Sequence, residues 1–197
     1  MFNRVILMIK YPTGKKVTSA VMHSNSGRGM NLENDINDSN TYYRECNRAL
    51  IYKKPTPIQV VKVDYPSRMH AKISEAYYKV PSTTDYNGIY RGRYIDFEAK
   101  ETKAKTSFTF QNIHPHQMDH LEKVMEHGGI AFLIIRFASF NETYLIDAKI
   151  VIEALSTLER RSIPYTFIKE NGHIIQESYL PRLKYLDVVD KIYFKED

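Results

Sequence analysis

Polar and apolar positions alternate along the stretch from Arg93 to Lys100. One parity carries the polar side chains and the other a small apolar row: Tyr94, Asp96, Glu98 and Lys100 against Ile95, Phe97 and Ala99. Side chains two residues apart on a β-strand point to the same face. The pattern therefore predicts a strand that presents two carboxylates and an amine together. Taken alone, it also fits an ordinary solvent-facing strand with alternating charge.

Helical periodicity appears in four other stretches. Apolar residues at near-helical spacing predict a helix over about 31–48, and a second helix begins at Pro115 and ends at Gly128-Gly129. Ala148–Leu158 and about 185–194 complete the set. Gln117 lies early in the second helix, where the edge of the sheet that carries the acids is expected. It is interpreted either as a metal or water ligand or as an ordinary surface residue.

Strands are predicted between these helices. Ala49–Tyr52 and Thr143–Ile146 are short, whereas Ile130–Phe137 is almost continuously apolar, as in a strand buried on both faces. Two further hairpins are predicted from turn residues: Tyr86-Asn87-Gly88 and Arg91-Gly92-Arg93 around Ile89-Tyr90, and Asn171-Gly172 between Tyr165–Ile168 and His173–Ile175. The order of elements predicts an α/β (α+β) fold with a mixed central sheet flanked by helices.

Residues 55–80 interrupt this order. Prolines bound the stretch, which mixes aliphatic, aromatic and basic residues. It is interpreted as an excursion out of the sheet, and the alternative is a pair of core strands joined by a loop. Cations for phosphates and rings for bases make several of its residues candidates for binding DNA: Lys62, Arg68, Lys72, Tyr77 and Lys79.

Basic residues are concentrated in the first half of the chain. Residues 1–32 carry five Lys or Arg and no acid, and residues 1–106 carry 18 basic and ten acidic side chains against ten and 13 in the remainder. This favours a polyanionic partner near the acids, or simply a basic surface. Residues 1–30 are interpreted as a flexible basic arm that includes Arg28, and 31–197 as a single domain.

Composition excludes several classes of protein. A single cysteine, Cys46, excludes an intramolecular disulfide framework. The longest apolar run, Gly129–Ile135, is too short to span a bilayer, and the N-terminus lacks the pattern of a signal peptide. A cytoplasmic protein without a membrane partner is expected. His114, His116 and His120 lack zinc-ligand spacing and are interpreted as solvent-facing or phosphate-contacting.

A carboxylate near a hairpin and an E-x-K on the next strand, with a helix behind, resemble the restriction-endonuclease-like PD-(D/E)xK nuclease core. Longer motifs resemble the RecU Holliday-junction resolvase family: Arg28-Gly29-Met30, Tyr42-Tyr43-Arg44, Lys53-Lys54-Pro55-Thr56-Pro57, Pro81 to Gly88, Gly92 to Thr102 and Lys105 to Phe108. The resemblance covers about residues 28–194, and it is less clear over 137–180.

The resemblance implies a set of site residues. Thr83, Asp85, Glu98 and Gln117 fall where the family binds Mg²⁺, which Mn²⁺ can replace, and Lys100 falls on its transition-state lysine. Asp96 matches an acidic position that supports the site, and 55–80 corresponds to the protruding stalk. The family acts as a homodimer, nicks four-way DNA junctions symmetrically and can interact with RecA. Alternatives are a less structure-specific nuclease and a non-catalytic junction-binding or RecA-modulating protein.

Overall fold

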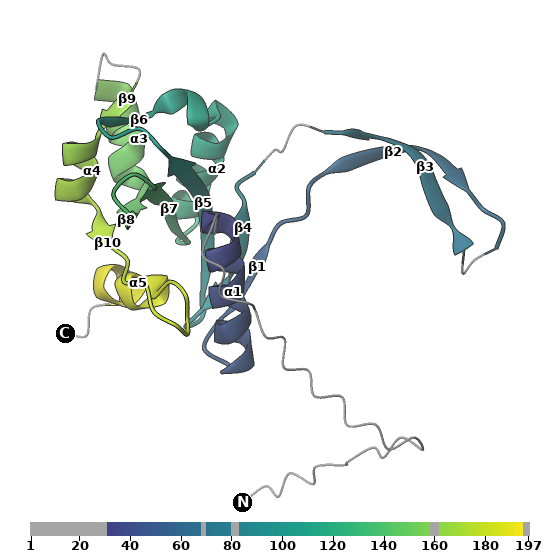
Figure 1. Ribbon diagram of the computed structural model, residues 1–197, viewed down its shortest axis with the longest axis horizontal. Coiled ribbons are helices and arrows are strands. Elements are labelled where there is room, and N and C mark those ends of the chain that lie inside the picture. Colours follow the sequence, from purple (N-terminus) through teal and green to yellow (C-terminus); the bar gives the residue numbers. More distant parts are fainter. Residues whose placement is uncertain (1–30, 68–69, 80–82, 158–161, 195–197) are drawn as a thin grey trace, which may run out of the picture.

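A six-stranded mixed sheet forms the centre of the molecule (Figure 1). The computed structural model describes residues 31–67, 70–79, 83–157 and 162–194. The predicted arm over 1–30, with Arg28, and the candidate Arg68 lie outside the described residues. The sheet has the order β1 (Leu50–Lys53), β4 (Tyr86–Tyr90), β5 (Arg93–Thr102), β7 (Ile130–Phe137), β8 (Glu142–Asp147) and β10 (His173–Ile174).

Strand β5 holds the centre of this sheet. It pairs antiparallel with β4, and Arg91 and Gly92 both have positive φ in the tight turn between them. On its other side β5 runs parallel to β7, with Glu98 opposite Leu133. A parallel pair needs a crossover connection, which helix α2 (Pro115–Glu126) supplies. A short two-stranded sheet, β6 (Ser107–Thr109) with β9 (Ser162–Pro164), lies outside the main one.

Helices cover both faces of the sheet and bury two apolar clusters. On one face, α1 (Leu32–Glu45) and α5 (Tyr185–Tyr193) pack over Ile95, Phe97 and Phe132. On the other, α2 and α3 (Ala148–Thr157) pack over Leu133 and Ile135. The prediction of a mixed sheet flanked by helices is confirmed. No helix in the described part of the chain is long and apolar enough to cross a membrane.

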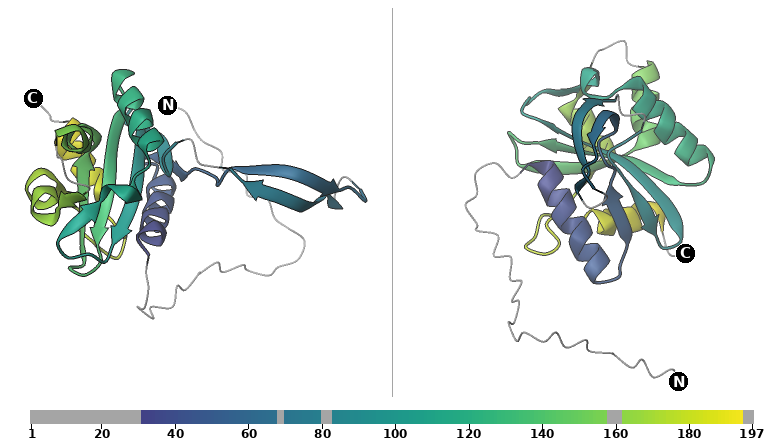
Figure 2. Two further views of the ribbon diagram at one scale, coloured as in Figure 1. Left: turned by 90° about the horizontal axis from the view of Figure 1, so that it is seen from above. Right: turned by 90° about the vertical axis from the view of Figure 1, so that its right-hand side faces the viewer.

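The excursion predicted over 55–80 protrudes from this body as a hairpin (Figures 1 and 2). Strands β2 (Ile58–Asp64) and β3 (Lys72–Tyr78) pair only with each other, and all 14 of their residues are exposed. The alternative reading as core strands is therefore wrong. At its base, the Lys79 N–H donates to the carbonyl of Pro57 at 3.0 Å, so the two ends of the hairpin lie side by side.

The turn predicted at Tyr86-Asn87-Gly88 is wrong, because these residues belong to strand β4. Here the glycine serves close packing of strands. A Cβ built on Gly88 would lie 2.0 Å from the backbone oxygen of Leu50 on β1. The Asn-Gly pair indicated backbone freedom, but it is the approach of the neighbouring strand that requires glycine.

The hairpin predicted at Asn171-Gly172 is also wrong. Tyr165–Asn171 form helix α4, and the Gly172 N–H closes that helix on the carbonyl of Ile168 at 2.8 Å. The Tyr165 ring packs against Phe137 and Phe140, and Ile168 is buried in the same cluster. These tertiary contacts outweigh the β-propensity of a short aromatic and aliphatic segment.

Candidate active site

Two carboxylates meet where β5 leaves its pairing with β4. Glu98 is fully buried in β5, and its Oε2 accepts the backbone N–H of Asp85 at 3.1 Å. Asp85 reaches back, and its Oδ2 accepts the backbone N–H of Ala99 at 3.4 Å. Because β4 begins only at Tyr86, opposite Phe97, the β5 edge at Ala99 is open to this side chain. The structure thus joins the segment before β4 to the acidic strand, as expected from the sequence.

Lys100 completes the cluster from the same face of β5. Its Nζ lies 2.6 Å from Glu98 Oε1, and its side chain is 23% exposed. Glu98 Oε1 makes no hydrogen bond of good geometry in the described structure, although it is buried. Carboxylate oxygens are the ligands that hard cations such as Mg²⁺ prefer.

The environment of Glu98 disfavours its charge. Burial and the nearby Asp85 carboxylate raise its pKa to about 7, against the opposing effect of Lys100. Among the described residues, no three or more His, Cys, Asp and Glu side chains gather as a complete metal centre. Two carboxylates with hydroxyl, amide and water oxygens suit Mg²⁺, which prefers oxygen ligands and keeps several waters. The donor set therefore fits a divalent cation.

A stability measurement tests this electrostatic picture. The folded state holds the Glu98 proton more tightly than the unfolded chain does, so this contribution to stability is lost as pH rises from about 4.5 to about 7. Without metal, we expect the free energy of unfolding to fall by about 3 kcal/mol over that range relative to Glu98→Gln. Urea unfolding in EDTA at pH 5 and pH 8 measures it. A constant difference between the two proteins would contradict the shift.

The structure connects Gln117 and Thr83 less directly to the Asp85–Glu98 pair. Gln117 is buried in the first turn of α2, where its Oε1 accepts the backbone N–H of His114 at 3.0 Å. No hydrogen bond joins it to Asp85 or Glu98 in the part of the chain that is described. Thr83 is half-buried two residues before Asp85. Both stay predicted ligands.

Asp96 has different surroundings from Glu98. Its carboxylate is fully buried and contacts Lys54 Nζ at 2.8 Å, the Tyr94 hydroxyl at 2.7 Å and the Thr84 hydroxyl. It also lies 3.0 Å from His120 Nε2. Four side chains thus enclose this carboxylate, and its supporting role in the site stays a prediction.

Three partners of Asp96 were not predicted from the sequence: Lys54, Thr84 and His120. His120, expected to face solvent or contact phosphate, is 25% exposed and places its Nε2 3.0 Å from the buried Asp96 carboxylate. His114 and His116 stack on each other, with ring centroids 5.4 Å apart. Lys54 and Thr84 stood inside quoted motifs, but no periodic pattern linked either of them to Asp96. Their roles depend on three segments that meet only in the folded chain.

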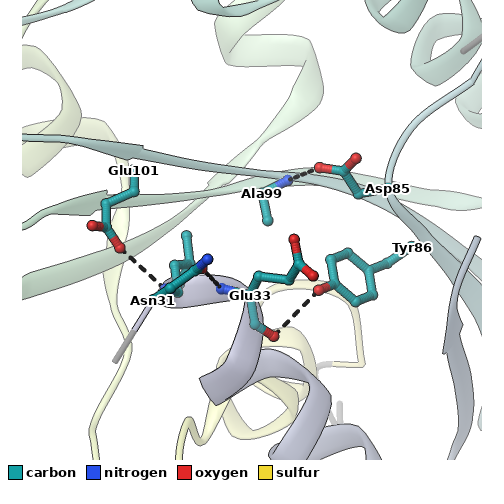
Figure 3. Close-up of a pocket in the computed structure, with 7 residues that line it drawn as sticks. Asn31, Glu33, Asp85, Tyr86, Ala99 and Glu101 are labelled. Atoms are coloured by element: carbon teal, nitrogen blue, oxygen red, sulfur yellow. Dashed lines mark hydrogen bonds between the residues drawn. The ribbon is translucent and has the colours of Figure 1, made fainter. Parts of the chain in front are cut away.

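A small cavity lies beside Asp85, between the start of α1 and strand β5 (Figure 3). Its wall includes Glu33, Glu101 and the Tyr86 ring. Glu101 Oε2 accepts the backbone N–H of Leu32, the first residue of α1, at 3.1 Å. Glu33 lies in the first turn of that helix and pairs with Lys53. Glu33 thus has two roles. It lines the cavity beside Asp85, and its negative charge interacts favourably with the positive N-terminal end of its own helix.

The candidate DNA-binding residues that the structure describes all lie on or beside the hairpin. Lys62, Lys72, Tyr77 and Lys79 are exposed. Tyr77 is 61% exposed, and its hydroxyl donates to Glu75. None of them contacts the carboxylate pair, so they form a separate surface.

Known proteins resemble this chain in sequence over most of its length. Residues 27–191 match the family described as RecU, Recombination protein U. Proteins named Holliday junction resolvase RecU from Bacillus mycoides and Geobacillus thermodenitrificans are 50% and 51% identical over 199 residues, which cover 95% of this chain and 100% and 99% of theirs. The structure of Hjc, a Holliday junction resolvase of Archaeoglobus fulgidus, covers 74% of this chain and 95% of its own at 11% identity, with a TM-score of 0.43. The chain belongs to the RecU family of recombination proteins.

Proposed function

We propose that this chain is a Holliday junction resolvase: a divalent-metal-dependent endonuclease that cuts four-way DNA junctions by paired symmetric nicks. It would serve homologous recombination and DNA repair in the cytoplasm. The observation that carries the proposal is the Asp85–Glu98 carboxylate pair beside Lys100. Membership of a family whose relatives bear the name of this activity supports it.

Asp85 and Glu98 would hold Mg²⁺, or Mn²⁺ in its place, with Thr83 and Gln117 as further oxygen ligands. The bound cation supplies the Lewis-acid charge that activates water for in-line attack on phosphorus. Because Glu98 is buried, bulk water would screen its attraction for the cation only weakly. Lys100 carries its ammonium beside the pair, where it stabilises the negative charge that develops on the phosphate.

The β2–β3 hairpin is proposed as the part that recognises the branched substrate. Ile58, Val60, Val61 and Ile73 are each more than 40% exposed on it, although apolar side chains gain nothing from contact with water. Its lysines and tyrosines suit phosphates and unstacked bases. Lys62, Lys72, Tyr77 and Lys79 stay candidate contacts, as do Arg28 and Arg68.

A homodimer is proposed because two symmetric nicks need two active sites. One face of the sheet leaves an apolar row uncovered on three adjacent strands. Leu50, Ile89 and Tyr94 are cross-strand neighbours, and they are 53%, 55% and 40% exposed. Such a row supports an interface with a second copy. Interaction with RecA is a further proposal, and it rests on the family resemblance.

Direct competition between substrates tests the proposed function. The protein is incubated with equimolar labelled four-way junction and linear duplex, each with Mg²⁺ and with EDTA. We expect symmetric nicks in the junction, little cleavage of the duplex, and no product in EDTA. Equal cleavage of both substrates would indicate a less structure-specific nuclease. Junction binding without cleavage at any Mg²⁺ or Mn²⁺ concentration would indicate a non-catalytic junction-binding protein.

A further inference from the structure

Lys54 connects three parts of the molecule. It follows β1 directly, and its backbone N–H donates to the carbonyl of Asp85 at 2.7 Å. Its ammonium donates to the Thr84 hydroxyl at 2.9 Å and to Asp96 Oδ2 at 2.8 Å. One residue therefore ties the end of β1 both to the segment before β4 and to β5.

These contacts of Lys54 lie next to the proposed metal ligands and include the backbone carbonyl of Asp85, but no ligand side chain. Thr84 stands between Thr83 and Asp85, and Asp96 is two residues before Glu98 on the same face of β5. A shift of the 83–85 segment along β5 would move Asp85 away from Glu98. The backbone bond and the two side-chain bonds of Lys54 oppose such a shift.

Two other side chains limit the loss of stability that is expected when Lys54 is removed. His120 Nε2 reaches Asp96 Oδ2 from α2 at 3.0 Å, and the Tyr94 hydroxyl donates to the same oxygen. Without Lys54, Asp96 would keep these two partners, which do not touch Thr84 or Asp85, and its direct hydrogen bond from the Thr84 hydroxyl. Lys54 is the side chain whose ammonium contacts both Thr84 and Asp96, and it adds to the direct hydrogen bond from the Thr84 hydroxyl to Asp96. The fold and the alignment of the ligands are thus separable.

We propose that Lys54 is a positioning residue for the metal-dependent reaction. Through Thr84 and Asp96 it holds the 83–85 segment in register with β5, and so it sets the geometry of the Asp85–Glu98 pair. It touches neither carboxylate of that pair with its side chain. The inference rests on the proposed function, because it assigns to Lys54 an effect on the affinity for the divalent cation. Lys54 also lies shortly before the β2–β3 hairpin, whose first strand begins at Ile58, and its backbone N–H donates to the active-site segment at Asp85.

Binding of Mn²⁺, measured by electron paramagnetic resonance of free Mn²⁺, tests this role without reference to cleavage. We expect Lys54→Met to weaken Mn²⁺ binding about tenfold or more relative to the natural protein. Lys149→Met is the matched control, because Lys149 is an exposed lysine that pairs with Glu153 on α3. Single-turnover junction cleavage should need correspondingly more Mg²⁺, while junction affinity in EDTA stays within a few fold.

A double variant separates positioning from loss of stability. Lys54→Met with Asp96→Asn removes the buried charge that the single variant leaves partly unpaired. We expect its melting temperature to return toward that of the natural protein, while Mn²⁺ binding stays weakened. Binding by Lys54→Met within twofold of the Lys149→Met control would overturn the inference, as would recovery of Mn²⁺ affinity together with stability. If the natural protein bound no Mn²⁺, the proposed metal-dependent function itself would fall.

Discussion

Replacing Glu98 with glutamine is expected to slow junction cleavage by about a thousandfold or more, which corresponds to about 4 kcal/mol of lost transition-state stabilisation. Glutamine keeps the size and one oxygen but removes the charge that holds the cation. Glu98 is buried, so solvent supplies no replacement anion. The backbone N–H of Asp85, which now donates to Glu98, can still donate to the amide oxygen. The fold should therefore remain intact.

Single-turnover cleavage of a labelled junction, with binding measured separately in EDTA, checks this result. Junction affinity should stay within a few fold, because the exposed hairpin surface is unchanged. Glu153→Gln, at an exposed glutamate of α3, is the matched control and should cleave normally. Cleavage by Glu98→Gln within tenfold of the natural rate would remove Glu98 from the ligand set.

Removing the β2–β3 hairpin is expected to lower junction affinity about a hundredfold, toward the affinity for duplex DNA, without unfolding the domain. Residues 58–78 are replaced by Asn-Gly. Because Lys79 and Pro57 are already hydrogen bonded across the base, a two-residue turn can join them. All residues of β2 and β3 are exposed, so the deletion takes no side chain from either apolar cluster.

Two measurements on the same variant serve as controls. Its melting temperature and its Mn²⁺ affinity should match those of the natural protein, because the carboxylate pair lies outside the deleted segment. Binding curves for junction and duplex at several salt concentrations then give the preference between the two substrates. An unchanged preference would mean that the body of the domain, and not the hairpin, recognises the junction. A loss of Mn²⁺ binding would show that the hairpin also supports the active site.

The sequence by itself determined the parts of this protein that local periodicity encodes. Alternation from Arg93 to Lys100 placed Glu98 and Lys100 on one face of a strand, and the structure has them 2.6 Å apart. Pro115 and the Gly128-Gly129 pair bounded a helix that the structure places at Pro115–Glu126. Such features depend on neighbours along the chain, so they can be predicted without knowledge of the fold.

Only the tertiary structure decided the rest. The Asn-Gly pair at Asn87-Gly88 lies within a strand because β1 packs against it. The pair at Asn171-Gly172 ends a helix because the Tyr165 ring packs against Phe137 and Ile168 is buried. The Asp96 carboxylate joins Lys54, 42 residues before it, to His120, 24 residues after it. A buried charge takes its partners from whatever segments the fold brings within about 3 Å. No pattern along the sequence indicates which distant segments come that close together.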